Sequence, residues 1–93
     1  MLQSFLVHSP DDAVAVAVQD ISPGPAVRGR VQEGDEVEIE VLDDIPLGHK
    51  IALRDLASGD QVIKYGTVIG RATRDIRAGE HVHVHNLKGE RWV

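Results

Sequence analysis

The feature that most constrains the fold is a short motif, Asp-(Ile/Leu)-x-x-Gly, which occurs four times in this chain of 93 residues. Its copies begin at Asp20, Asp44, Asp55 and Asp75. An aspartate can accept hydrogen bonds from a turn, the apolar residue can anchor the turn to a core, and glycine allows a positive φ. The motif therefore predicts a repeated entrance to a strand. A longer match between residues 44–56 and residues 75–87 indicates an internal repeat.

Short runs of strand-forming residues lie between these turns. Residues 13–18 are rich in valine, and residues 36–41 and 50–54 alternate apolar with polar side chains. About seven short strands are expected, and no convincing helical period persists beyond about two turns. The predicted fold class is all-β, in a single domain over residues 1–93. A domain of this size buries only about 60–65% of its unfolded surface, so a stabilising partner chain is plausible.

Histidine alternates with valine over residues 81–85. In a strand, His81, His83 and His85 would line one face while the two valines, Val82 and Val84, enter a core. Neighbouring imidazoles would be rooted about 6–7 Å apart and the outer pair about 13 Å apart, so one metal would be shared by at most two neighbours. The row can be a metal site, an acid/base site or the polar face of a solvated edge strand.

The internal repeat indicates which histidines of this row the fold requires, because equivalent positions of the two copies should have the same structural role. The residue equivalent to His83 in the other copy is Ala52, so the fold does not demand a histidine at that position. The residue equivalent to His81 is Lys50, which is also polar. His83 is therefore the residue of the row that a structural role explains least.

Composition narrows the ligand classes. The chain has no cysteine, which excludes disulfides and thiolate ligands and leaves nitrogen and oxygen donors. Its net charge of −5 divides into −8 for residues 1–44 and +3 for residues 45–93. A locally basic, histidine-bearing surface favours a small anionic ligand or an acidic partner over nucleic acid. With neither a secretory signal nor a run of 18 apolar residues, the chain is expected to be cytoplasmic and not to enter a membrane.

Three segments together resemble a known family: residues 48–50 (Gly-His-Lys), residues 64–66 (Lys-Tyr-Gly) and residues 79–86 (Gly-Glu-His-Val-His-Val-His-Asn). Over residues 10–88 the chain resembles the small SAF-type domain of altronate and galactarate dehydratases, and it is similar to the small subunit of sulfolactate sulfo-lyase. The resemblance implies a β-clip fold, in which a long bent hairpin folds back on itself. It also implies a large catalytic partner subunit or region, without which the chain is inactive.

The family chemistry is elimination of water from a sugar acid, or of sulfite from sulfolactate. It needs a base, a group that stabilises an enolate, and an acid for the leaving group. The resemblance implies a divalent metal, Fe2+ or Mn2+, shared with the large subunit. The candidate residues are His83, His85, Lys64 and Tyr65 for catalysis, His49, Lys50, Arg71 and Asn86 for substrate binding, and His81 and His83 for the metal. Asn86 can instead orient an imidazole.

Two other interpretations stay open at this point. SAF-type β-clips also occur in non-catalytic binding and assembly proteins, and fold alone does not distinguish these from a lyase component. Alternatively, the domain only gates or stabilises the large subunit, which then carries every catalytic group. The histidine row favours the lyase component, and an alanine variant of His83 separates it from the gating role.

Overall fold

The computed structural model describes residues 3–9, 11–32, 34–64 and 66–89. Over this part the chain forms strands, turns and bridges without a helix, which confirms the all-β class. None of the described residues therefore belongs to a helix that could cross a bilayer. The strands are β1 (Phe5–Val7), β2 (Val14–Ala17), β3 (Gly24–Val31), β4 (Glu36–Val41), β5 (Lys50–Ala52), β6 (Gln61–Lys64), β7 (Thr67–Ala72), β8 (His81–Val82) and β9 (Leu87–Gly89).

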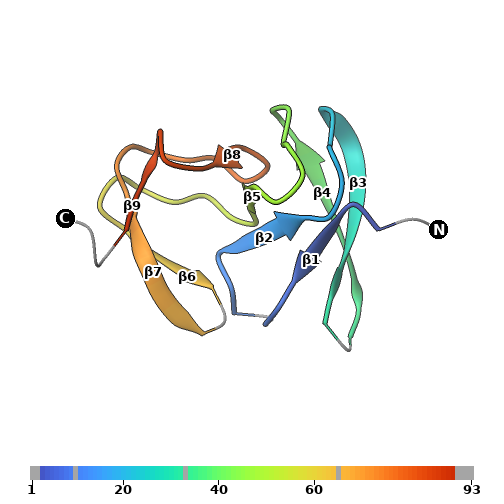
Figure 1. Ribbon diagram of the computed structural model, residues 1–93, viewed down its shortest axis with the longest axis horizontal. Coiled ribbons are helices and arrows are strands. Elements are labelled where there is room, and N and C mark those ends of the chain that lie inside the picture. Colours follow the sequence, from blue (N-terminus) through green and yellow to red (C-terminus); the bar gives the residue numbers. More distant parts are fainter. Residues whose placement is uncertain (1–2, 10, 33, 65, 90–93) are drawn as a thin grey trace.

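The strands form two sheets (Figure 1). The larger sheet has the order β4-β3-β1-β2-β5-β8, and β6-β7-β9 form the smaller one. β1 and β3 pair in parallel, whereas the other neighbours are antiparallel. The long β3–β4 hairpin has a register shift between Gly24 and Val27, and such bulges bend a strand. The architecture is consistent with the β-clip that the family resemblance implied.

β2 and β5 separate two hydrophobic cores. Alternate residues point to opposite faces of a strand, so Ala15 and Ile51 enter a core with Phe5. Val14 and Ala52 enter the second core, which lies against the smaller sheet. This two-sided burial explains why residues 13–17 are nearly all apolar rather than alternating with polar residues.

The larger sheet curls until the chain after β4 meets the chain before β8. The backbone N–H of Leu42 donates to the carbonyl of Gly79 at 2.9 Å. The backbone N–H of His81 donates to Oδ2 of Asp43, also at 2.9 Å. These two bonds close the sheet around the first core and fix the point at which the histidine segment starts.

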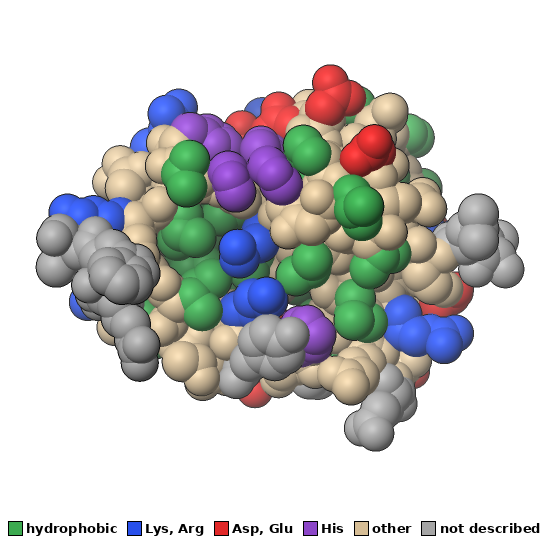
Figure 2. Space-filling view, in the orientation of Figure 1, with side chains coloured by type: hydrophobic (Ala, Val, Ile, Leu, Met, Phe, Trp, Pro, Cys, Tyr) green, Lys and Arg blue, Asp and Glu red, His purple; other side chains and the backbone are tan. Residues whose placement is uncertain are grey.

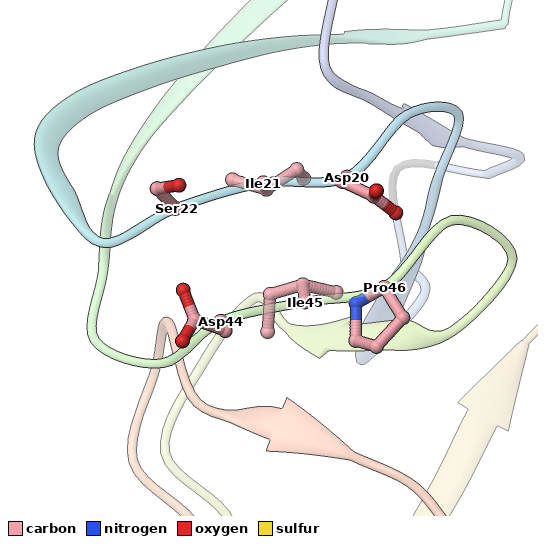
Figure 3. A pocket seen from close by; sticks show the side chains of 6 residues that line it. All are labelled: Asp20, Ile21, Ser22, Asp44, Ile45 and Pro46. Atoms are coloured by element: carbon pink, nitrogen blue, oxygen red, sulfur yellow. The ribbon is translucent and has the colours of Figure 1, made fainter.

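The four motif copies associate in pairs. Ile21 forms an antiparallel bridge with Ile45, and Leu56 forms one with Ile76. Figure 3 shows the first pair, in which two chain segments run side by side along a shallow pocket. The predicted repeat is therefore a unit of structure, and each of its apolar anchors packs beside that of another copy.

Each bonded motif aspartate reaches the turn of its paired copy rather than its own turn. Oδ1 of Asp20 accepts from the N–H of Leu47 at 2.8 Å. Oδ1 of Asp55 accepts from Ala78 at 2.8 Å, and Oδ1 of Asp75 accepts from Ser58 at 2.9 Å. The residue equivalent to Leu47 in the first copy is Pro23, which has no N–H to donate.

The glycines of three copies have the predicted positive φ, at 85° for Gly48 and 91° for both Gly59 and Gly79. The expectation is wrong for Gly24, which is not among the described glycines with positive φ. Gly24 is the first residue of β3 and pairs with Val41, a place that calls for extended backbone.

Candidate metal and substrate site

Two strands that pair with each other bring the histidines together. Lys50 of β5 lies opposite Val82 of β8, and Ile51 lies opposite His81. Continuing this register by one residue places His49 opposite His83, which directly follows β8. Directly opposite residues of antiparallel strands share a face. Segments 32 residues apart in sequence therefore contribute imidazoles to one surface.

Three imidazoles form the cluster. Nδ1 of His49 lies 2.8 Å from Nε2 of His81. The ring of His49 stacks on that of His83, with centroids 4.0 Å apart and an interplanar angle of 18°. One ring nitrogen of each residue lies within 4.8 Å of the corresponding nitrogens of the other two, and all three side chains are partly buried. We call His49, His81 and His83 the imidazole cluster.

The flat strand expected for residues 81–85 is wrong. β8 ends at Val82 and residues 84–86 form a turn. Val84, expected in a core, is 82% exposed. The turn also brings the ring of His85 to 5.1 Å from that of His81, much closer than an extended strand allows. Within the row, one metal could still be shared by only two neighbours, His81 and His83, and the third possible ligand is His49, directly before β5.

Asn86 holds this turn. Its Oδ1 accepts from the backbone N–H of His83 at 2.9 Å, and its Nδ2 donates to the carbonyl of His81 at 2.8 Å. The residue is 4% exposed. Both polar groups of the side chain thus bond to the backbone of cluster residues, an arrangement that orients imidazoles and leaves the amide poorly placed for a substrate.

We expect Asn86→Ala to weaken metal binding by about 10–100-fold, the range typical for residues that orient metal ligands. The change leaves the N–H of His83 and the carbonyl of His81 without their partner, which costs roughly 1–3 kcal/mol for each buried group. Asn86→Asp keeps the acceptor and loses the donor, so its effect should be intermediate. Zn2+ titration against a competing chelator measures both variants. Unchanged affinity in Asn86→Ala would contradict this role.

The surroundings of His81 favour its neutral form. Burial lowers the pKa of His81, and the nearby His85, His49 and His83 lower it further, against an opposite effect of Asp43. A neutral ring nitrogen is the form that binds a metal. His81 is therefore disposed to bind a cation rather than a proton near neutral pH.

This lowered pKa predicts acid-sensitive stability in the metal-free protein. The unfolded chain takes up a proton on His81 at about pH 6.5, whereas the folded chain takes it up only at lower pH. The free energy of unfolding contributed by this group is therefore complete above about pH 6.5 and is lost as the pH falls through the lowered value. Urea unfolding in chelator at about pH 7.5 and about pH 5.5 measures the loss. It should be smaller in His81→Gln, and an equal loss would contradict the assignment.

Lys50 lies close to the cluster, and Lys64 lies near Lys50. Lys50 directly follows His49, and its charge contributes to the lowered pKa of His83, after burial and His49. Burial lowers the pKa of Lys64, and Lys50 lowers it further, whereas Asp12 raises it. Figure 2 shows histidine side chains gathered on one face with Lys or Arg side chains beside them. Lys50 therefore belongs to the same region as the imidazoles.

Two other predicted site residues, Arg71 and Tyr65, cannot be added to the cluster. Arg71 lies on β7 of the smaller sheet, where its Nη1 donates to the carbonyl of Gly59 at 3.2 Å. Tyr65 lies outside the described residues.

His49 was expected to bind substrate, and its place among possible metal ligands was missed. The signal was present in the two matched segments of the repeat, because pairing them antiparallel sets His49 against His83. Similarity between the two segments predicts that they have similar local structure. It does not predict that they pair with each other as strands.

The chain matches a known family model and several named proteins. The altronate/galactarate dehydratase SAF domain model matches residues 3–90. The (2R)-sulfolactate sulfo-lyase subunit alpha of Chromohalobacter salexigens is 51% identical over 90 residues, which cover 95% of this chain and 96% of that protein. Its counterpart in Paracoccus pantotrophus is 55% identical over 60 residues, which cover 64% of this chain and 90% of that protein.

A third relative is much longer than this chain. Altronate dehydratase of Bacillus subtilis is 44% identical over 87 residues, which cover 94% of this chain but 16% of the dehydratase. The same unit thus occurs as nearly the whole of a named subunit and as a small part of a long enzyme. The chain belongs to the altronate/galactarate dehydratase SAF domain family.

Proposed function

We propose that this chain is the histidine-bearing component of a lyase that acts on an anionic 2-hydroxy acid, and that a large catalytic subunit completes its site. The observation that carries the proposal is the meeting of His49, His81 and His83 on one face in a chain of this family. The names of its relatives, a sulfo-lyase and a dehydratase, both describe eliminations. A cytoplasmic location stays a prediction.

(2R)-sulfolactate is the first candidate substrate. The two sulfo-lyase subunits are 51% and 55% identical to this chain, against 44% for the altronate dehydratase. A sugar acid of the altronate type is the second candidate, supported by the 94% of this chain that the dehydratase matches.

Both candidates undergo the same class of reaction. A base removes the proton on the carbon that bears the hydroxyl and the carboxylate. From sulfolactate, sulfite leaves the next carbon with the electron pair of the carbon–sulfur bond, and the resulting enol becomes pyruvate. From a sugar acid, the hydroxyl of the next carbon leaves as water after it takes a proton. Each path needs a base near neutral pKa and cationic groups for the developing negative charge.

The chain's own residues supply several of these functions. His85 lies beside the cluster with its ring 5.1 Å from that of His81, so we assign proton transfer to it, with His83 as the other candidate. Lys50 and Lys64 supply positive charge for carboxylate or sulfonate groups. Asn86 positions His81 and His83 through their backbone.

The imidazole cluster fits a divalent metal. Two nitrogens bound to one ion at about 2.1 Å lie at most about 4.2 Å apart, so nitrogens already within 4.8 Å need only a side-chain adjustment. Imidazole donors suit Fe2+ and Mn2+ among other ions, and His49, His81 and His83 would hold one, with further ligands from the large subunit. When bound, such an ion polarises substrate oxygens and stabilises the enolate charge.

The test is co-expression with a large lyase subunit, taken from the neighbouring reading frame if one is encoded there, followed by assays of the purified complex. Sulfite and pyruvate released from (2R)-sulfolactate would support the first substrate, and keto-acid formation from altronate or galactarate would support the second. A complex that forms but eliminates from none of these acids would reject the proposal. The large subunit assayed alone shows whether this chain is needed.

A further inference from the structure

We propose that the surface around the imidazole cluster is where the large lyase subunit docks, with Leu47 and Val84 as its apolar anchors. The proposal rests on the proposed function and names the face through which the two chains meet.

The exposed apolar side chains carry this inference. Within the described part of the chain, the large hydrophobic residues that are exposed are Val18 at 47%, Leu47 at 62% and Val84 at 82%. Single exposed hydrophobics are ordinary on a protein surface, whereas their concentration in one place indicates an interaction site. Here they concentrate at the cluster.

Each of the three is tied to a cluster histidine through the backbone. Leu47 lies two residues before His49, and Val84 directly follows His83. Val18 follows Ala17, whose N–H and carbonyl bond to His49 and Gly48 at 2.9 Å. In Figure 2 hydrophobic side chains lie on both sides of the histidine group. The turn that carries Leu47 and the turn that carries Val84 therefore place apolar side chains around the polar imidazole cluster. An interface that encloses a reactive site has this arrangement.

The relatives indicate the occupant. The unit makes up 16% of the altronate dehydratase, so most of that enzyme is available to pack against it, and the sulfo-lyase relative is itself named a subunit. The imidazole cluster by itself leaves its outer side open, whereas the proposed elimination benefits from exclusion of water. A lyase subunit seated on Leu47 and Val84 would cover that side.

The experiment compares Leu47→Asp, Val84→Asp and the double variant with wild type, using as the probe the same large lyase subunit that is co-expressed in the test of the proposed function. Gln32→Asp is the control, because it adds the same negative charge outside the proposed surface. Gln32 directly follows β3, at the opposite end of the β3–β4 hairpin from Gly24. Association is measured by biolayer interferometry and sedimentation. Zn2+ affinity and melting temperature are measured on the same preparations.

We expect each single substitution to weaken association at least about tenfold, as for interface anchors, with Zn2+ affinity and melting temperature unchanged. Gln32→Asp should associate like wild type. If a variant folds poorly, Leu47→Ser and Val84→Ser replace it.

Two outcomes would overturn the docking surface. The first is association of the double variant within about twofold of wild type in an active complex, which would leave the proposed function standing. The second is self-association of this chain that Val84→Asp abolishes while binding of the large subunit persists, which would assign the face to a second copy. If wild type fails to bind the large subunit at all, the proposed function itself fails.

Discussion

Replacing His83 with alanine is expected to lower both the metal content and the turnover of the assembled lyase by at least about 100-fold. Loss of a residue that merely orients a ligand already costs about 10–100-fold, and this change removes one of the three proposed ligands. His83 also stacks on His49 at 4.0 Å, so its loss disturbs a second member of the cluster. Metal analysis of the purified complex and steady-state assays measure the two effects.

The matched control is His8→Ala. His8 lies 3.4 Å from Oε1 of Gln32 through its Nδ1, in contact with the segment that follows β3. We expect wild-type metal content and turnover in this control. Wild-type values in His83→Ala as well would contradict the metal site, and they would support a domain that only gates or stabilises the large subunit.

The second large effect is on stability. Gly79→Ala is expected to destabilise the domain by roughly 2–5 kcal/mol. A Cβ at this position would lie in forbidden contact with the carbonyl oxygen of Glu40 and 3.4 Å from Cγ of Leu42. Overpacking costs about 1–3 kcal/mol, and a left-handed conformation adds about 1–2 kcal/mol for a residue other than glycine. A domain of this size has only about 5–15 kcal/mol in total.

Gly59→Ala separates the two causes. Gly59 has the same φ of 91°, but a Cβ there would meet nothing within 4 Å. We expect it to lose only the conformational part, about 1–2 kcal/mol. Urea unfolding followed by circular dichroism measures both variants. Equal destabilisation of the two variants would show that the close approach of Gly79 to Glu40 does not contribute to the loss of stability in Gly79→Ala.

The backbone turns were predictable because they depend on neighbours in sequence. The recurrence of glycine after Asp-Ile-x-x or Asp-Leu-x-x indicates a need for positive φ at that position. Three of the four motif glycines have it. Gly24 differs because it already belongs to a strand, and strand pairing is a long-range contact. The pairing of motif copies, Ile21 with Ile45 and Leu56 with Ile76, was not visible in the repeat for the same reason.

The histidine segment shows where local patterns stop being sufficient. Strict alternation over residues 81–85 indicates a strand, yet the chain turns after Val82 because Asn86 bonds back to His81 and His83. A short turn held by one buried amide overrides the period-two pattern, and it leaves Val84 in solvent.

The all-β class, the turn motif, the family and most candidate residues could be predicted from the sequence, because residue type, spacing and backbone preference are local properties. The meeting of His49 with His81 and His83, and the exposure of Leu47 and Val84 beside them, became visible in the folded chain. That arrangement depends on the register between β5 and β8 and on the closure of the curled sheet at Leu42 and Gly79. Both are set by packing between segments distant in the chain, which no local pattern encodes.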